Sequence, residues 1–104
     1  MTPPPAAFRL VYRSFDRVTY DPVKSDDILA RRGFDLPYLK RMFPGWVLER
    51  SETRHCHDVR YQAVGEMLGN VWFVDYTRFG TFCHLITGWE ADARERRVWY
   101  DAIR

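Results

Sequence analysis

The segment LITGWEADARERRVWY, from Leu85 to Tyr100, joins an apolar run to an amphipathic run that is rich in charge. Its first part predicts a strand that breaks at Gly88, and its second part predicts a helix from Glu90 to Ala102. A strand-to-helix junction leaves side chains exposed on a rigid base, so it is a common place for an active site. Trp89 stands at this junction. Two interpretations follow: the segment binds an anionic substrate, or an anion-binding site has been lost here. The apolar stripe of the predicted helix contains Ala91, Arg94 or Glu95, Val98, Trp99 and Ala102.

Three strands are predicted in the segment that leads to this junction. Their sequences are VRYQAVGEM, VWFVDYTR and TFCHLITG, at residues 59–67, 71–78 and 81–88. The turns between them, LGN and Phe79-Gly80, are two or three residues long, as in antiparallel hairpins. The second half of the chain is therefore predicted to be an antiparallel meander.

The first half of the chain predicts two helices between further strands. Asp21-Pro22 is a typical helix start and Gly33 a typical helix stop, so residues 24–32 are predicted as a helix. A second, short helix is predicted from Asp35 to Phe43, and Pro44-Gly45 ends it. The other elements predicted here are strands at 17–21 and 46–50 and a polar loop at 51–58.

In order, these elements predict β-α-α-β-β-β-β-α with no parallel crossover. We expect an α+β fold with a single small antiparallel sheet, two N-terminal helices and one C-terminal helix, and with the helices on one face. Residues 1–15 are predicted to be an extension, with a tail at 1–7 and either more tail or an edge strand at Phe8–Phe15. Residues 16–104 are predicted to form a single domain.

The composition is that of a small globular protein with a preference for arginine. The chain has 104 residues, a net charge of +2, 46% apolar residues and 16% aromatic residues. No apolar run approaches the roughly 20 residues of a membrane span, and a signal peptide is not expected. With two unclustered cysteines, these features predict a cytoplasmic protein. Of the 16 basic residues only Lys24 and Lys40 are lysine. The preference for arginine suits phosphate binding, and the alternative explanation is a GC-rich genome that favours arginine codons.

The motif closest to a metal site is HCH, at His55, Cys56 and His57. The two histidines point the same way in an extended chain, but a closed zinc site needs four ligands. Cys83 and His84 would have to supply the others. We therefore expect a polar loop here, with no metal and no cofactor. The sequence also lacks phosphate-binding and dinucleotide-binding glycine patterns and a GxSxG motif.

Arginines and aromatic residues on a small sheet remain as the chemical signal. Metal-free RNA cleavage needs a group that activates the ribose 2′-hydroxyl, cations that stabilise the phosphorane, and an acid for the leaving oxygen. Taken alone, each residue of suitable type is better explained as surface charge or as part of an ion pair. These residues are Lys24, Arg60, Arg78, His84, Glu95 and Tyr100.

Taken together, the segments resemble the BrnT toxins. YDPVKSDDILARRGFD, from Tyr20 to Asp35, is similar to the family's opening: an aromatic residue, Asp-Pro-x-Lys, a helix, and a basic residue before Gly. A Phe follows about ten residues later in the family, here Phe43. The resemblance continues to Tyr100 and covers about four-fifths of the chain. Its later matching positions are Arg60, Gly65, Gly69, Tyr76-Thr77, Ala91, Glu95 and Tyr100.

The resemblance implies a RelE-like fold and a metal-independent endoribonuclease that is toxic because it cleaves cellular RNA. It also implies a cognate antitoxin with a ribbon-helix-helix DNA-binding domain, so that the toxin would meet DNA only through the antitoxin complex and would need no membrane. The residues assigned here to catalysis are Lys24, Arg60, His84 and Glu95. Those assigned to RNA binding are Arg31, Arg32, Arg78, Trp89, Arg94 and Tyr100.

The sequence departs from the family pattern at several positions. It has Ile28 for an Asn, Arg31-Arg32-Gly33 for Lys-His-Gly, His84 for an Arg, and Trp89 for the Arg at the strand end. A Trp can stack on a base but cannot stabilise phosphorane charge. Two hypotheses follow: an active ribonuclease toxin, or a weakened or inactive homologue that serves as an antitoxin-binding module in operon control. We rank three interpretations of Trp89: a residue packed in the core comes first, a weakened phosphate site second, and a base-stacking residue third.

Overall fold

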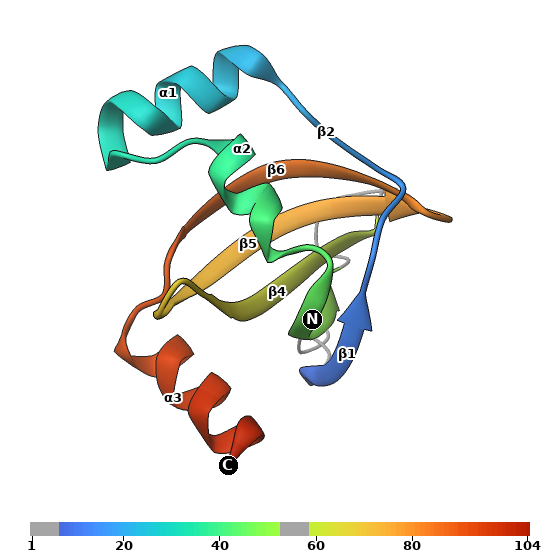
Figure 1. The fold of residues 1–104 in the computed structure, drawn as a ribbon, viewed down its shortest axis with the longest axis vertical. Coiled ribbons are helices and arrows are strands. Elements are labelled where there is room, and N and C mark those ends of the chain that lie inside the picture. The colour runs from blue at the N-terminus through green and yellow to red at the C-terminus, as the bar shows by residue number, and fades with distance from the viewer. Residues whose placement is uncertain (1–6, 53–58) are drawn as a thin grey trace, which may run out of the picture.

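The computed structural model describes residues 7–52 and 59–104 of the chain. Within these residues the predicted α+β class is confirmed (Figure 1). Two α-helices of the described residues lie in the first half of the chain and one lies at its C-terminal end. In sequence order the elements are β1 (Arg9–Arg13), β2 (Arg17–Tyr20), α1 (Pro22–Arg32), α2 (Leu36–Leu39), the 3₁₀ helix η1 (Lys40–Met42), β3 (Gly45–Glu52), β4 (Arg60–Met67), β5 (Asn70–Phe79), β6 (Phe82–Glu90) and α3 (Ala93–Ile103).

The six strands of the described residues form one mixed sheet in the order β1-β3-β4-β5-β6-β2. The predicted antiparallel meander is confirmed for β4, β5 and β6, and β3 and β1 extend it with antiparallel pairing. The expectation of a purely antiparallel sheet is wrong, because β2 pairs in parallel with β6, from Arg17 opposite Phe82 to Tyr20 opposite Leu85. Local sequence patterns cannot identify a partner strand that lies so far along the chain.

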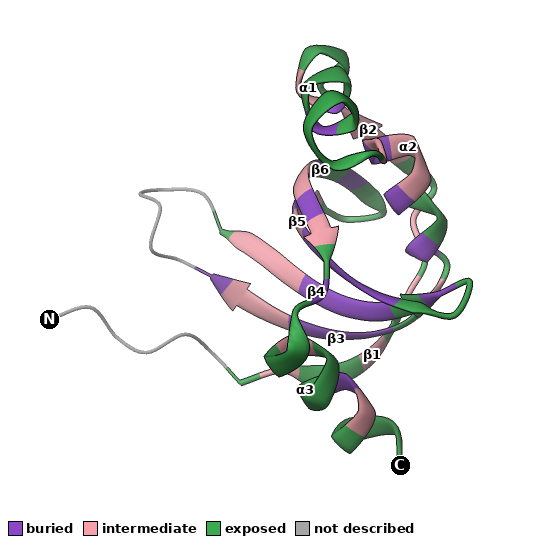
Figure 2. Cartoon of the chain, turned by 90° about the vertical axis from the view of Figure 1, so that its left-hand side faces the viewer, coloured by how far each residue is buried: buried purple, intermediate pink, exposed green. Residues whose placement is uncertain are grey.

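Helices cover both faces of the sheet, and the expectation that they share one face is wrong (Figure 2). On the face that we call the α1/α2 face, Ile28 of α1 belongs to one apolar cluster with Val74 of β5. On the other, the α3 face, Trp99 of α3 belongs to a second cluster with Val64 and Phe73. The central strands are apolar at consecutive positions, so both of their faces require cover.

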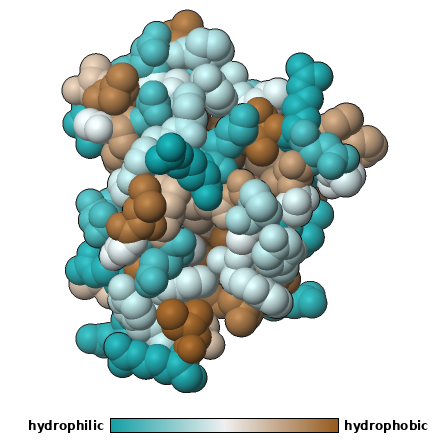
Figure 3. All heavy atoms as spheres, in the orientation of Figure 1, coloured by the Kyte–Doolittle hydropathy of each residue, from teal (hydrophilic) through white to brown (hydrophobic). Residues whose placement is uncertain are grey.

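Apolar side chains also remain on the surface, at separate places. On the side of the molecule seen in Figure 3 they form small patches among polar residues. Among the most exposed large apolar residues, Val23 lies at the start of α1, Leu68 in the β4–β5 turn, and Phe79 at the end of β5. Isolated apolar residues of this kind are usual on globular proteins.

Helix α1 begins and ends where its capping residues predict. The Asp21 side chain accepts a hydrogen bond from the Val23 amide at 2.9 Å, and Pro22 takes the first helical position. Gly33 ends the helix in the left-handed region, with φ 83°, as glycine C-caps do. The second predicted helix is also present, as α2 followed directly by η1, and it begins after Asp35.

The last helix starts three residues later than predicted, at Ala93 rather than at Glu90. Strand β6 continues to Glu90, and the Ala91 amide still donates to the Val71 carbonyl at 2.9 Å. Asp92 then caps α3, and its side chain and that of Glu95 form a reciprocal capping box. This cap, rather than the end of the apolar run, decides where the helix begins.

Gly88 does not break strand β6, which corrects the prediction for this residue. It lies inside the strand, opposite Val74 of β5. A Cβ added at this position would run into the Leu39 side chain of α2 and lie 2.8 Å from the Phe73 carbonyl oxygen. Gly88 is therefore explained by the close packing of α2 on the sheet.

The turns of the meander are as short as predicted, but β3 is longer. Leu68 and Gly69 connect β4 to β5 with φ values of 53° and 86°, the positive pair typical of a type I′ hairpin. Ser51 and Glu52 pair with β4 and so belong to β3 rather than to the predicted loop. The rest of that loop, residues 53–58, lies outside the described residues.

The N-terminal extension contributes an edge strand. Residues Arg9–Arg13 form β1, which pairs with β3. Residues 1–6 of the predicted tail lie outside the described residues. In the part of the chain that the structure describes, no helix is both long and apolar enough to span a membrane.

We expect Gly88→Ala to lower the free energy of unfolding by about 1–3 kcal/mol, the usual cost of overpacking a filled site. Denaturation followed by tryptophan fluorescence measures this change. Glu90→Ala, at an exposed position of the same strand, is the control and should change the value by about 0.5 kcal/mol or less. Similar small effects of the two substitutions would contradict close packing of α2 on Gly88.

Candidate functional site

The α3 face has an apolar half under α3 and a polar half beyond it. Alternate residues of a strand point to the same face. On β4, therefore, Gln62 and Arg60 share the face of Val64, and on β5 Asp75 and Thr77 share the face of Phe73. The Glu52 end of β3 and the Arg60 end of β4 extend past the helices (Figure 2). The polar half lies on these ends.

Two rows of polar residues cross this half of the sheet. Each row follows from the pairing of the strands, with Arg60 opposite Thr77 one step beyond the Tyr61–Tyr76 pair. The first polar row, next to the apolar half, consists of Arg50, Gln62, Asp75 and Thr87. The second polar row consists of Glu52, Arg60, Thr77, His84 and Thr19.

Arg60 and His84, both predicted as catalytic, lie in the same polar row. His84 is exposed, and its Nδ1 lies 2.9 Å from the Thr19 hydroxyl oxygen, which also lies 3.4 Å from the Cys83 carbonyl. No hydrogen bond within the described residues involves His84 Nε2, so this nitrogen is open to a substrate. Arg60 stands two strands away, about 10 Å between backbones at the usual strand spacing.

A cleft of about 390 Å³ opens beside the first polar row. Arg50 is held on one side of it: its Nε donates to Gln62 Oε1 at 2.7 Å, and its guanidinium lies 4.3 Å from the centre of the Phe8 ring. Arg94 is exposed at the start of α3. The cleft therefore adds two guanidiniums to the same face of the sheet. Its charged lining residues are Arg50, Asp92, Arg94 and Glu95.

Glu95 and Trp89 tie α3 to the end of β6. Glu95 Oε1 accepts hydrogen bonds from the Asp92 amide at 2.9 Å and from the Trp89 indole at 3.1 Å. The Trp89 ring stacks on Phe73, with centroids 4.4 Å apart and planes at 10°. Arg32 lies 5.9 Å from the Trp89 ring centre. Trp89 thus has the packing role that we expect first, and Glu95 has a structural role.

Three of the predicted residues belong to α1, whose buried side packs on the opposite face. Lys24 is half-buried in its first turn. Arg31 is exposed and forms an ion pair with Asp27 at 2.6 Å. Arg32 donates to the Gly88 carbonyl at 2.7 Å, on the part of β6 that extends beyond its pairing with β2. The structure does not bring these three residues to the polar rows.

A buried ionic cluster on the α1/α2 face centres on Glu49 of β3, which is 7% exposed. Arg13 of β1 binds both of its carboxylate oxygens, at 2.6 and 3.0 Å. The Tyr76 hydroxyl donates to the same carboxylate, and Arg78 approaches it at 3.3 Å. Arg78 also lies over the Tyr61 ring, 4.0 Å from its centre. Arg78, predicted to bind RNA, is therefore part of this cluster rather than of the polar rows.

The cluster holds its members in defined protonation states. Burial acts to raise the pKa of Glu49, but the hydrogen bonds from Arg13 and Tyr76 and the charge of Arg78 outweigh it, so the pKa is lowered overall. Burial and the bond to Glu49 raise the pKa of Tyr76. Its hydroxyl therefore stays protonated and remains a donor. The bond to Glu49 also raises the pKa of Arg13.

Sequence reasoning missed Glu49, Arg13, Tyr76 and Arg50. The signal for Glu49 was present, because in WVLER it alternates with Val47 and so points to an apolar face. A charged residue on a buried face requires partners. Nothing in the sequence indicated that these would come from β1 and β5.

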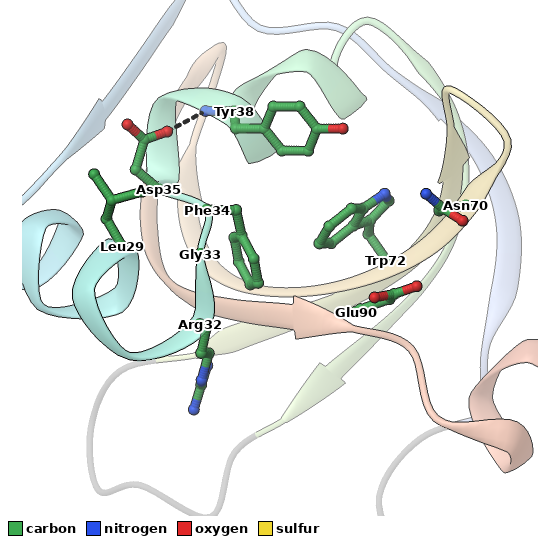
Figure 4. A pocket seen from close by; sticks show the side chains of 9 residues that line it. All are labelled: Leu29, Arg32, Gly33, Phe34, Asp35, Tyr38, Asn70, Trp72 and Glu90. Carbon is green, nitrogen blue, oxygen red and sulfur yellow. Dashed lines mark hydrogen bonds between the residues drawn. The ribbon is translucent and has the colours of Figure 1, made fainter.

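A cleft of about 800 Å³ lies on the α1/α2 face between the C-terminal end of α1, the start of β5 and the end of β6 (Figure 4). Phe34 and Tyr38 contact Trp72 edge to face, with centroids 5.0 and 5.4 Å from its ring. Its charged lining residues are Arg32, Asp35 and Glu90. With two carboxylates and one arginine that is already hydrogen-bonded, this cleft does not suit a phosphate.

The candidate metal motif, His55, Cys56 and His57, lies outside the described residues. Within the described part of the chain, no three His, Cys, Asp or Glu side chains are grouped as metal ligands. Cys83, which would have completed the site, is buried. Burial and the nearby Glu49 charge raise the pKa of its thiol to about 12, so it is protonated at neutral pH.

Six of the ten predicted site residues thus lie on the α3 face or in α3 itself. Among them Tyr100 packs half-buried against the apolar cluster under α3. No protein-family model and no curated protein matches this chain. A proposed function therefore rests on the arrangement of these side chains and on the resemblance of Tyr20–Tyr100 to the BrnT toxins. The six residues are Arg60, His84, Trp89, Arg94, Glu95 and Tyr100.

We expect the stability of the protein to fall in acid in a way that depends on Glu49. Because its pKa in the folded state lies below the ordinary 4.5, the ionised carboxylate stabilises the fold above that pH. This stabilisation is lost as the pH falls through the lowered value. Glu49→Gln should be about 3 kcal/mol less stable at neutral pH and should lose less on acidification, as measured by urea denaturation at several pH values.

Asp27→Asn is the matched control for this experiment, because Asp27 forms an exposed ion pair. It should leave both the neutral stability and the acid dependence close to those of the unsubstituted protein. An acid dependence that is the same with and without the Glu49 carboxylate would contradict the assigned role.

Proposed function

We propose that this chain is a metal-independent endoribonuclease of the toxin type, with its active surface on the polar half of the α3 face. The observation that carries the proposal is the second polar row, in which Arg60 and an exposed His84 share one face. The resemblance of Tyr20–Tyr100 to the BrnT toxins supports it. The two arginines of the neighbouring cleft, Arg50 and Arg94, suit the flanking phosphates of an RNA strand.

In the proposed reaction the ribose 2′-hydroxyl attacks the adjacent phosphorus, and the bond from phosphorus to the 5′ oxygen breaks. His84 Nε2 takes the proton of the 2′-hydroxyl, and water protonates the departing 5′ oxygen. The products are a 2′,3′-cyclic phosphate and a 5′-hydroxyl end. Arg60 stabilises the charge of the phosphorane. The Thr19 hydroxyl, 2.9 Å from His84 Nδ1, orients the imidazole.

His84 suits this role because of its place on the sheet. It is the one imidazole in the part of the chain that the structure describes. Imidazole is the side chain that enzymes use most often as a general acid or base. Its row also provides the threonine hydroxyls on either side, Thr19 and Thr77.

A second candidate function is that of an inactive homologue that binds an antitoxin and takes part in operon control. The specific observation in its favour is that Glu95 and Trp89 are engaged with each other and with Phe73. In the resembled family an arginine stands in place of Trp89. Without it, the surface near α3 lacks one cation for the transition state.

In both cases we propose a ribbon-helix-helix antitoxin as the partner. A patch on β1 and the start of β3 suits such a contact: Leu10, Tyr12 and Trp46 are exposed there, and the Tyr12 and Trp46 rings lie 5.5 Å apart. β1 is also an edge strand of the sheet, and an open strand edge can pair with a segment of another chain. Aromatic residues are typical anchors of protein interfaces.

We expect purified protein to cleave RNA in the presence of excess EDTA and Arg60→Ala to reduce the rate about a hundredfold or more, as for loss of one transition-state donor. Gel analysis of a defined RNA, with mapping of the cleaved ends, measures this. Arg41→Ala is the control, because Arg41 is an exposed arginine of η1, and it should retain the full rate.

Activity that disappears with EDTA and returns with a divalent ion would overturn the proposed mechanism. An equal loss in the Arg60 and Arg41 variants would remove the polar row as the active surface. No cleavage by any protein, together with normal growth on expression and binding of a neighbour-encoded ribbon-helix-helix protein, would favour the second candidate function.

For Trp89→Arg we expect a loss of about 2 kcal/mol in the free energy of unfolding, below the usual cost for a fully buried aromatic residue. RNA cleavage per folded molecule should not increase, because the introduced guanidinium would face the Glu95 carboxylate. Trp46→Arg is the matched control, since Trp46 is 60% exposed, and it should cost about 0.5 kcal/mol or less. Faster cleavage at unchanged stability would instead show that Trp89 replaced a phosphate-binding residue.

A further inference from the structure

A further cleft lies at the β1 edge of the sheet, where the Glu49 cluster reaches the surface, and it shares only Arg50 with the polar rows. Its volume is about 330 Å³, and four arginines and one carboxylate line it. The net charge of its lining is therefore +3. We call it the arginine cleft, and its charged residues are Arg9, Arg13, Arg50, Arg78 and Glu49.

Two of these guanidiniums are held in the cleft by their neighbours. Arg13 binds the Glu49 carboxylate with two hydrogen bonds, at 2.6 and 3.0 Å. Arg78 is fixed between the same carboxylate and the Tyr61 ring. The Arg50 guanidinium is held on the α3 side by Gln62 and Phe8, so Arg50 borders the cleft without being central to it. A ligand that binds here does not have to order these side chains, which favours affinity.

The cleft has more hydrogen-bond donors than the protein itself uses. A guanidinium carries five N–H groups and no acceptor. The Glu49 carboxylate accepts hydrogen bonds from Arg13, Arg78 and Tyr76, so its oxygens are already shared among three donors. Within the described residues Arg9 is exposed and its side chain has no hydrogen-bonded or ionic partner. An anion with several oxygens would use its donors together with those N–H groups of Arg13 and Arg78 that line the cleft.

The shape and chemistry of the cleft favour a phosphoryl group over a nucleobase. The planar fork of arginine matches two oxygens of a phosphate at once. The Tyr61 ring is covered by Arg78 and so does not present that face for base stacking. Ser51 adds a hydroxyl to the lining, which can donate to a phosphate oxygen.

We propose that the arginine cleft is a phosphoryl-binding site. It is separate from the proposed catalytic pair, because Arg13, Glu49 and Arg78 face the α1/α2 side while Arg60 and His84 face the α3 side, and only Arg50 borders both surfaces. Binding there requires no cleavage, so the site can exist whether or not the chain is a nuclease. The phosphoryl group can belong to a free polyphosphate or to the backbone of a nucleic acid strand, and both present the same oxygens.

The test uses the whole protein with inorganic pyrophosphate and, in parallel, a short single-stranded DNA. The DNA lacks the 2′-hydroxyl and cannot undergo the proposed cleavage, so its binding is measured independently of the nuclease. NMR amide shifts should change at β1 and at Glu49–Ser51. Arg9→Gln should weaken binding about threefold or more, and the Arg9 side chain forms no hydrogen bond with Glu49 that the folded cluster would lose.

The control is Arg41→Gln, at an exposed arginine that does not line the cleft. It removes the same charge and should weaken binding less than about twofold, through the general field alone. Pyrophosphate binding that DNA does not displace supports a free polyphosphate as the ligand. Displacement by DNA supports a nucleic acid backbone.

Three outcomes would overturn the proposal. The first is the absence of shifts in the arginine cleft with either ligand. The second is an equal loss of affinity in the Arg9 and Arg41 variants, which would mean non-specific attraction. The third is tighter binding of a glutamate hexapeptide than of pyrophosphate, which would assign the cleft to an acidic protein segment. RNA cleavage by the Arg9 variant is scored separately, so failure of the site and failure of the nuclease remain distinguishable.

Discussion

The carboxylate of Glu49 holds together three strands at one side of the sheet. A charge that is removed from water is costly unless hydrogen bonds and opposite charges compensate. Here the compensation comes from Arg13 on β1 and from Tyr76 and Arg78 on β5. Edge strand β1 is thereby attached by side chains as well as by its backbone pairing with β3. The same interaction turns two guanidiniums toward one cleft, so a requirement of folding also creates a surface for anions.

The second constraint is that the central strands are apolar on both faces. Helices α1 and α2 cover one face, and α3 covers only part of the other. The uncovered part therefore has to be polar, and it contains the two polar rows with Arg60 and His84. The candidate active surface is the part of this face that α3 does not cover. A polar surface on a rigid sheet holds its side chains at fixed spacing, which suits catalysis.

The junction at Trp89 now has a physical explanation. The Trp89 ring stacks on Phe73, its indole donates to Glu95, and Glu95 in turn caps α3. A residue that joins the last strand to the last helix in this way serves the fold. The residues that we propose to bind phosphate on the α3 face lie elsewhere, in the polar rows and in the neighbouring cleft.

The sequence by itself determined the local elements of this protein, because their signals act over a few residues. Asp21-Pro22 marks the start of α1 and Gly33 its end, as predicted, and the short turns define the meander. Only the tertiary structure decided which faces the helices cover, that β2 pairs in parallel with β6, and that Gly88 makes room for α2. It also decided that Arg60 and His84 share a row while Lys24 and Arg78 lie elsewhere. These outcomes depend on contacts between residues far apart in the chain, and periodicity and caps contain no information about such contacts.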